Sequence, residues 1–156
     1  MLEINGNIWD DPTLNVICIL TNGTVKSNGE NIMGGGIALE AAIRIPHLPK
    51  HYGSMINSYG LHLQAVAIYE KHNKNQIILA FPTKYHISFN ADTKLIMQSF
   101  TELQTFCNIF PMYRIGLPRP GSGLGGLEWN KVKDILQYMW DNKQENRLVI
   151  YNNENK

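Results

Sequence analysis

Glycines and polar side chains cluster between an apolar run and an Ala-rich segment in the first third of the chain. Residues 16–20 are apolar and indicate a buried strand, whereas residues 36–45 have helical length and end before Pro46. Between them lie three consecutive glycines and four polar residues that can hydrogen-bond a sugar: Asn22, Lys26, Ser27 and Asn28. Glycines let the backbone approach a ligand closely, and a helix start presents unpaired N–H groups and a positive dipole end. This segment therefore predicts a phosphate-binding loop.

The same layout recurs near the C-terminus. Residues 112–117 indicate a strand, residues 118–126 a glycine-rich loop and residues 130–141 a helix. Residues 121–126 also fit the G-x-G-x-x-G pattern, but in dinucleotide-binding folds that pattern belongs to the first strand–helix unit. One glycine cluster can be an ordinary turn. Two clusters, each between a strand and a helix, favour two loops that clamp a diphosphate from both sides.

The rest of the chain alternates between strand and helix patterns. Besides the segments above, we expect strands at 2–4, 14–21, 61–69, 76–81 and 147–151, helices at 50–59 and 92–106, a long loop at 82–91 and a frayed tail at 152–156. The helix at 36–45 is apolar nearly all round and is expected to pack deeply, and Asn130 is expected to cap the last helix. This alternation predicts one α/β domain over residues 1–156, with a mixed central sheet sandwiched between helices. Ligands of such sheets bind at the carboxyl ends of the strands, where both glycine loops are expected.

Composition favours a soluble, cytoplasmic, monomeric protein. The 156 residues are 44% hydrophobic and 17% charged, and the net charge of +1 provides no basic field to recruit nucleic acid. No run approaches the ~20 apolar residues of a membrane span, and the N-terminus lacks the regions of a signal peptide. Cys18 and Cys107 are expected to be buried thiols rather than a disulfide.

Several other side chains have two readings. Asn22 and Asn28 are either turn residues or ribose ligands, and Tyr151 either packs in the core or stacks on a purine. His86 lies in the expected long loop, where surface residence is favoured over lining a cleft. We expect no metal site, because Pro49 between His47 and His51 prevents the helical face that their spacing would need.

With these motifs in view, the sequence resembles a macro domain. The resemblance is carried by residues 21–38, 45–49, 81–84 with 91–92, 117–129 and 148–151, which together cover the chain nearly end to end. It is greatest to the branch that contains the terminal ADP-ribose glycohydrolase type, the antitoxin macro domains that reverse DNA ADP-ribosylation, and short stand-alone bacterial and phage members. The resemblance implies a mixed sheet between helices that binds ADP-ribose, or an ADP-ribosylated substrate, in a surface cleft.

The resemblance also implies which residues contact the ligand. Gly34, Gly35, Gly36 and Ile37 would face the diphosphate and proximal ribose, while residues 121–125 would cover the diphosphate and distal ribose. The full expected set of binding residues is Asn7, Ile8, Asn22, Gly23, Asn28, Gly34, Gly35, Gly36, Ile37, Pro120, Gly121, Ser122, Gly123, Leu124, Gly125 and Tyr151.

The chain departs from the family pattern at three places. Asn7 follows Gly6 where the family has an acidic residue for adenine, and Asp10 or Asp11 is an open substitute. The glycohydrolase branch has a lysine early in the first-loop helix, but residues 39–44 contain none. It also has an aspartate in the second glycine loop, where this chain has Gly125.

Without that lysine, a covalent lysyl route is not expected. What remains is Asn28 orienting the distal ribose for attack by water, with Lys26, Glu40 and His86 as candidate proton-transfer groups.

Two functions follow from the resemblance. The first is hydrolysis of an ADP-ribosyl linkage or of ADP-ribose 1″-phosphate, without a cofactor, and the alternative is a non-catalytic ADP-ribose reader or sequestering protein. The sequence does not indicate whether the ADP-ribosylated acceptor is a protein side chain, a DNA base or a free metabolite. Nucleic acid is expected only as an ADP-ribosylated acceptor, because Lys50, Lys84, Arg114 and Arg119 are scattered along the chain.

Overall fold

A mixed six-stranded sheet forms the centre of the protein. The computed structural model describes residues 1–140 and 147–152. Its strands lie in the order β1-β6-β5-β2-β4-β3, in which neighbours from β1 to β4 are parallel and β3 is antiparallel to β4. The strands are β1 (Leu2–Asn5), β2 (Val16–Asn22), β3 (Gln64–Lys71), β4 (Lys74–Lys84), β5 (Ile115–Pro118) and β6 (Leu148–Asn152). The predicted α/β class with a mixed sheet is confirmed.

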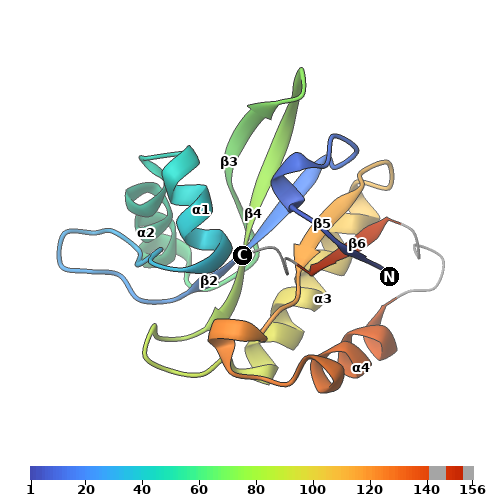
Figure 1. Ribbon diagram of the computed structural model, residues 1–156. Coiled ribbons are helices and arrows are strands. Elements are labelled where there is room, and N and C mark those ends of the chain that lie inside the picture. Colours follow the sequence, from blue (N-terminus) through green and yellow to red (C-terminus); the bar gives the residue numbers. More distant parts are fainter. Residues whose placement is uncertain (141–146, 153–156) are drawn as a thin grey trace.

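Helices cover both faces of this sheet (Figure 1). They are α1 (Gly36–Arg44), α2 (Leu48–Tyr59), α3 (Thr93–Ile109) and α4 (Trp129–Met139), with short 3-10 turns η1 (Ile8–Asp10) and η2 (Gly123–Gly125). One core cluster joins α1 and α2 to one face of the sheet, and a second joins α3 and α4 to the other face. The two glycine loops lead into α1 and α4, so they approach the same sheet edge from opposite faces.

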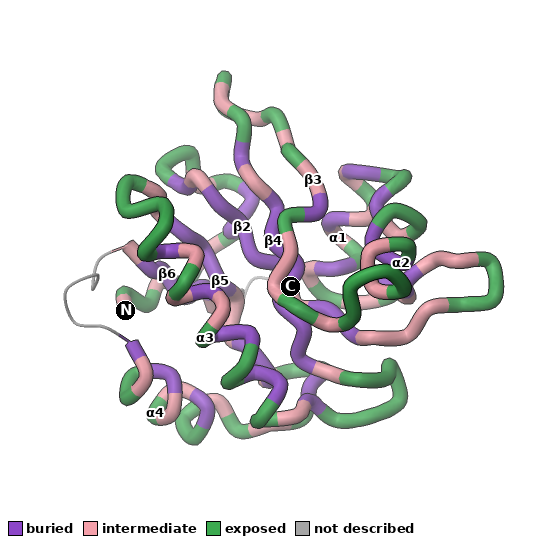
Figure 2. Tube along the Cα trace, turned by 180° about the vertical axis from the view of Figure 1, so that it is seen from behind, coloured by how far each residue is buried: buried purple, intermediate pink, exposed green. Residues whose placement is uncertain are grey.

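The apolar run of β2 is explained by burial on both faces. Ile17 and Ile19 pack in the cluster with α1 and α2, whereas Val16 and Cys18 pack in the cluster with α3 and α4. Figure 2 shows β2 buried along most of its length, while the helices alternate between buried and exposed residues. This rigid central strand carries the first glycine loop at its carboxyl end.

The expectation that the helix at 36–45 packs deeply was wrong. In α1 the small residues Ala38 and Ala41 are buried against the sheet, whereas Leu39 is 40% exposed and Ile43 is 69% exposed. The helix covers the sheet with one side only, and the alanines let it approach closely. Its outer side therefore carries apolar groups in contact with solvent.

Three boundaries also differ from the sequence prediction. β4 continues to Lys84 instead of ending at residue 81, because its parallel pairing with β2 extends to the Asn22–Lys84 register. Helix α4 has Glu128 rather than Asn130 at its N-cap, and position 141 of the predicted helix lies outside the described residues. Asn152 belongs to β6 rather than to a tail, and residues 153–156 lie outside the described residues.

Both cysteines are buried free thiols, as predicted. Burial raises the pKa of the Cys18 thiol well above its ordinary value and raises the pKa of Cys107 to about 11. Over residues 1–140 and 147–152, no helix is long and apolar enough to cross a membrane. In the same part of the chain, no three His, Cys, Asp or Glu side chains gather as metal ligands.

Candidate functional site

A cavity of about 520 Å³ opens at the carboxyl ends of four parallel strands. Its floor comes from the last residues of the neighbouring strands β6, β5, β2 and β4. Those residues are Tyr151, Asn152, Pro118, Leu20, Thr21, Asn22, Thr83 and Lys84. The position agrees with the sequence prediction that a ligand site lies at this edge of the sheet.

The first glycine loop forms one side of the cavity. Gly34, Gly35 and Gly36 line it, and Gly35 is the N-cap of α1 without a side-chain capping bond. The first N–H groups of a helix have no carbonyl partner inside the helix, and the helix dipole places partial positive charge there. This arrangement suits an anionic oxygen.

The second glycine loop forms the opposite side. Gly121 and Gly123 line the cavity with φ angles of 81° and 63°, in the left-handed region that glycine adopts without steric cost. Backbone hydrogen bonds fix the loop, from Leu127 N–H to the Gly121 carbonyl at 2.8 Å and from Ala91 N–H to the Gly125 carbonyl at 2.9 Å. The loop is therefore a formed structure and not an open coil.

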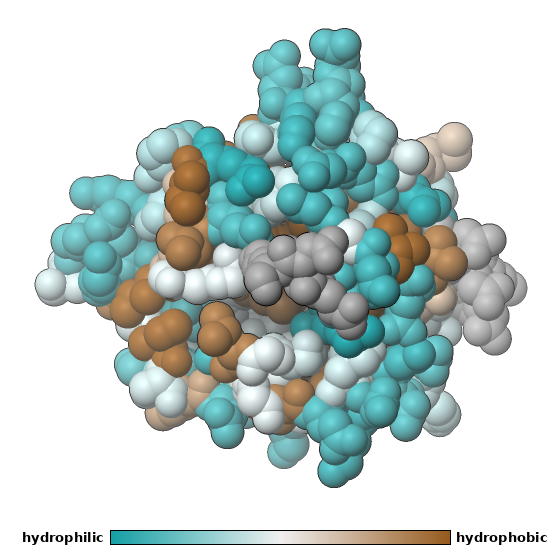
Figure 3. Space-filling view, in the orientation of Figure 1, coloured by the Kyte–Doolittle hydropathy of each residue, from teal (hydrophilic) through white to brown (hydrophobic). Residues whose placement is uncertain are grey.

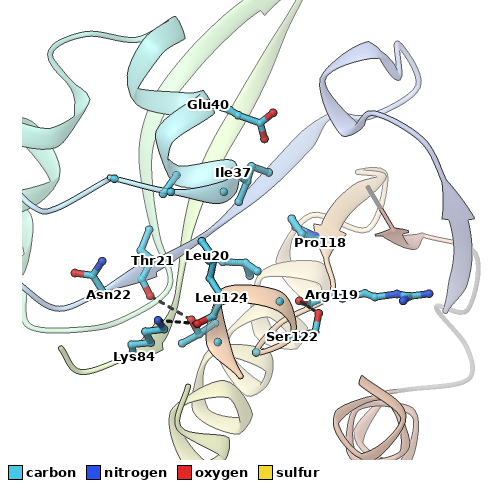
Figure 4. A pocket seen from close by; sticks show the side chains of 18 of the residues that line it. Leu20, Thr21, Asn22, Ile37, Glu40, Lys84, Pro118, Arg119, Ser122 and Leu124 are labelled. Atoms are coloured by element: carbon cyan, nitrogen blue, oxygen red, sulfur yellow. Dashed lines mark hydrogen bonds between the residues drawn. The ribbon is translucent and has the colours of Figure 1, made fainter. Parts of the chain in front are cut away.

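The two loops meet across the cavity at Leu124 and Gly35. The Cδ1 atom of Leu124 lies 2.8 Å from the point where a Cβ on Gly35 would stand, although 75% of the Leu124 residue is exposed. Figure 4 shows Leu124 reaching from its loop towards the strand end that carries Leu20 and Thr21. Figure 3 shows the molecule from the same side as Figure 1, with brown hydrophobic residues beside paler residues of intermediate hydropathy. The side chain of Leu124 thus bridges the two loops across the cavity.

Lys84 brings an amine to one end of the cavity. Its Nζ donates a hydrogen bond to the Leu124 carbonyl oxygen at 3.2 Å, and Figure 4 shows it beside Thr21 and Asn22. Residues 39–44 contain no lysine, so a lysyl route was not expected from the sequence. In the structure, a lysine from the end of β4 lines the cavity. Strand β4 continues beside β2 as far as Lys84, a long-range pairing that no local sequence pattern shows.

The other end of the cavity is formed by Ile8, Glu40 and Tyr151. Tyr151 is 3% exposed, and its hydroxyl donates a hydrogen bond to the Asp11 carboxylate. Burial raises the pKa of Tyr151, and the neighbouring carboxylate raises it further. Burial also raises the pKa of Asp11, but hydrogen bonds from Thr13 and Tyr151 outweigh it and leave that pKa lowered. Tyr151 thus forms a fixed aromatic wall of the cavity. Asp11 holds the Tyr151 hydroxyl and does not itself line the cavity.

The structure brings most of the predicted site residues together. The predicted residues that line the cavity are Ile8, Asn22, Gly34, Gly35, Gly36, Ile37, Glu40, Gly121, Ser122, Gly123, Leu124, Gly125 and Tyr151. The predicted residues outside its lining are Asn7, Gly23, Lys26, Asn28, His86 and Pro120.

Asn28 and Lys26 belong to a separate hairpin instead. Residues 23–33 protrude beyond α2 in Figure 1, closed by a bridge between Val25 and Asn31. The Asn28 side chain accepts from the Glu30 N–H at 3.0 Å and donates to the Glu30 carboxylate at 2.6 Å, and Lys26 pairs with Glu30 at 3.4 Å. The structure therefore places Asn28 as a turn residue away from the cavity.

The other predicted site residues outside the cavity lining also have structural roles. Asn7 caps η1 by accepting the Trp9 N–H at 3.0 Å, and Pro120 is buried. A Cβ on Gly23 would stand 2.6 Å from the Tyr85 carbonyl oxygen, so this glycine permits close packing of two loops. His86 is exposed, with its Nδ1 bonded to the Ser88 hydroxyl at 2.7 Å, which matches the surface reading.

Asn22 lines the cavity while it holds the hairpin in place. Its Nδ2 donates to the Ile32 carbonyl, and its Oδ1 accepts from the Thr24 N–H, both at 2.9 Å. Asn31 donates to the Asn22 and Thr24 carbonyls at 2.8 Å and 3.0 Å. These paired asparagines fix the start of the first loop.

Solved structures share this fold. The macrodomain of Mycobacterium tuberculosis DarG is similar with a TM-score of 0.75 and 21% identity, covering 96% of this chain and 95% of the other. The macrodomain of Thermus aquaticus DarG is similar with a TM-score of 0.74 and 23% identity, over the same shares. Thermosipho africanus DarTG in complex with ADP-ribose has a TM-score of 0.72 and 22% identity, over 93% of this chain and 39% of that chain. The protein therefore has the macrodomain fold, which confirms the resemblance seen in the sequence.

One curated relative is also similar in sequence. It is a DNA ADP-ribosyl glycohydrolase of Thermus aquaticus, 25% identical over 136 residues, or 86% of this chain. The chain spans only 36% of the length of that relative. No protein-family model matches the chain.

Proposed function

We propose that the cavity binds ADP-ribose or a close derivative and that the protein hydrolyses an ADP-ribosyl linkage. The observation that carries the proposal is the meeting of two glycine loops, at Gly35 and Leu124, over the N-terminus of α1. The unpaired N–H groups at the start of α1 suit a diphosphate, and the second glycine loop covers the same place from the other side. The ADP-ribose complex of the similar Thermosipho protein supports the same ligand.

The dimensions of the cavity fit this ligand. Its volume of about 520 Å³ lies within the range of small-molecule sites. Its floor runs from β6 to β4, three strand spacings apart, or roughly 14 Å. In the proposed pose the adenine lies at the Ile8 and Tyr151 end, the diphosphate between the loops, and the distal ribose beside Asn22 and Lys84.

Lys84 is the candidate nucleophile at the distal ribose. In its neutral form the Nζ attacks the anomeric carbon while the bond from that carbon to the acceptor breaks. The acceptor leaves with the electron pair and takes up a proton, and water then cleaves the new carbon–nitrogen bond to release ADP-ribose and the free amine. Arg119 also borders the cavity, but its guanidinium lies 3.8 Å from the Glu3 carboxylate and over the Trp129 ring. This proposed lysine route takes the place of the mechanism expected from the sequence, in which water attacks a distal ribose held by Asn28.

The second candidate is a non-catalytic ADP-ribose reader or sequestering protein. It is favoured by Gly125, which leaves no carboxylate in the second loop, and by the position of Glu40 on α1 at the end opposite Lys84 (Figure 4). In that function Lys84 would hold the ligand as a cation. A third outcome is release of phosphate from ADP-ribose 1″-phosphate.

One assay separates these functions. The protein is incubated with single-stranded DNA ADP-ribosylated on a base, with ADP-ribosylated protein, and with ADP-ribose 1″-phosphate, and free ADP-ribose is measured. We expect catalytic release from the DNA substrate, the acceptor class that the name of the curated relative suggests. Tight binding of all three without release would identify a reader and overturn the hydrolase.

A further inference from the structure

The loop that follows Lys84 exposes aromatic rings next to the cavity. In this aromatic loop (residues 85–89), Tyr85 is 51% exposed, Phe89 is 58% exposed and Ile87 is 38% exposed. Ile87 also lines the cavity. Exposed aromatic groups beside a ligand site need an explanation, because large apolar side chains gain free energy by burial.

The rings are not what holds the loop in place. The Ile87 N–H donates to the Thr24 hydroxyl at 2.9 Å, and the Phe89 N–H donates to the His86 carbonyl at 3.0 Å. The residues that flank the loop are also joined, since the Asp92 N–H donates to the Thr83 carbonyl at 2.8 Å. Backbone bonds therefore fix the loop, which leaves Tyr85 and Phe89 available for a partner.

The position of the loop identifies what it would meet. In the proposed pose Lys84 lies at the distal ribose, so the group bonded to that ribose leaves the cavity beside Tyr85. The His86 and Phe89 rings contact each other, with centroids 5.3 Å apart, and present a partly preformed aromatic surface. Residues 85–91 contain no charged side chain. Such a surface suits the flat face of a base better than a charged peptide.

We propose that the aromatic loop is the acceptor subsite, where Tyr85 and Phe89 stack on unpaired bases of a single-stranded nucleic acid that carries the ADP-ribosyl group. This inference rests on the proposed function of the cavity. Stacking on aromatic rings tolerates any base sequence, because every base has a flat π face. With a net charge of +1, the protein gains little from phosphate contacts, so an unmodified strand binds weakly and a modified strand binds through the ADP-ribosyl group and stacking together.

The test compares affinities for free ADP-ribose and for a short single-stranded oligonucleotide with one ADP-ribosylated base. Phe89→Ala and Tyr85→Ala should each weaken binding of the oligonucleotide roughly tenfold and leave the affinity for free ADP-ribose unchanged. Phe89→Trp should restore binding, since it keeps a stacking surface. Tyr138→Ala is the matched control, because Tyr138 is 93% exposed on α4, outside both the cavity and the aromatic loop.

Three outcomes would overturn the inference. The inference fails if the alanine variants bind the oligonucleotide like the wild type, lose affinity for free ADP-ribose equally, or lose affinity for an ADP-ribosylated peptide as strongly as for the oligonucleotide. The last would assign the loop to a protein acceptor. If the wild-type protein fails to bind free ADP-ribose, the proposed function fails and the inference with it. If it binds ADP-ribose and only the variants show no effect, the inference alone fails.

Discussion

The Nζ of Lys84 donates a hydrogen bond to the carbonyl oxygen of Leu124 at 3.2 Å. This contact joins the end of β4 to the second glycine loop, 40 positions further along the chain. A lysine ammonium has three donors, so this bond leaves others for a ligand. In the proposed pose, this contact holds an amine beside the distal ribose.

Two replacements of Lys84 distinguish the role of its positive charge from the proposed role of its nitrogen as a nucleophile. We expect Lys84→Met and Lys84→Arg both to lower the rate of ADP-ribose release by roughly a hundredfold or more, the scale of losing a positioned catalytic group. Lys84→Arg keeps the charge and should retain affinity for ADP-ribose. Single-turnover rates and calorimetry measure the two effects. An arginine variant with the rate of the wild type would contradict a nucleophilic role.

Gly35→Val should block the diphosphate without unfolding the protein. Gly35 has an extended φ of −155°, which any residue adopts, and a Cβ there meets only the flexible end of Leu124. We expect ADP-ribose affinity to fall below detection while the thermal unfolding midpoint changes little. The double variant Gly35→Val with Leu124→Ala removes that one contact. Recovery of binding in the double variant would show that the loss came from displacing Leu124 rather than from filling the phosphate site.

The sequence was sufficient for the parts of the site that depend on local pattern. The apolar run of β2 was predicted as a buried strand. Both glycine loops were predicted at the carboxyl ends of the strands, where the cavity lies. Lys84 was missed because Pro82 suggests the end of a strand. The parallel pairing with β2 nevertheless continues past it, through a register shift between Thr21 and Asn22. That pairing joins Asn22 to Lys84, 62 positions apart, and leaves no local signal in the sequence.

Asn28 shows the opposite error. Its residue type and its place in a glycine-rich segment suggested a ribose ligand. The bridge between Val25 and Asn31 turns that segment into a hairpin that extends away from the cavity. Whether a polar loop folds over a ligand or on itself depends on its packing partners, here α2, where a Cβ on Gly53 would overlap the Gly29 carbonyl oxygen. That contact is not readable from spacing.

Asn31→Ala should destabilise the protein, whereas Asn28→Ala should not. Asn31 is 1% exposed, and its amide supplies the Asn22 and Thr24 carbonyls with a donor. Losing that donor removes two hydrogen bonds at a buried position, although the Thr24 carbonyl keeps its bond from the Ile32 N–H at 3.1 Å, and we expect the free energy of unfolding to fall by about 1–3 kcal/mol. Asn28 is exposed, so its variant should stay within about 0.5 kcal/mol. Urea denaturation measures both, and equal effects would disprove the assigned roles.

Asp11 should contribute to acid sensitivity. Folding lowers its pKa below the ordinary value of 3.8, so its stabilising effect is present above that value and is lost as the pH falls through the folded pKa. Asp11→Asn should therefore flatten the dependence of unfolding free energy on pH between about pH 5 and pH 2. Asp134→Asn changes the net charge equally at an exposed position of α4 and is the control. The same acid slope in wild type and Asp11→Asn would refute the Asp11–Tyr151 contact as a source of stability.

The most direct test of the account is calorimetric titration of the wild-type protein with ADP-ribose at two salt concentrations. We predict binding near micromolar affinity, roughly −8 kcal/mol, and no heat with Gly35→Val. Because the diphosphate is expected to lie among backbone N–H groups rather than in a basic field, the affinity should change little with salt. Absence of heat from the folded wild-type protein at millimolar ADP-ribose would contradict the central claim that this cavity binds ADP-ribose.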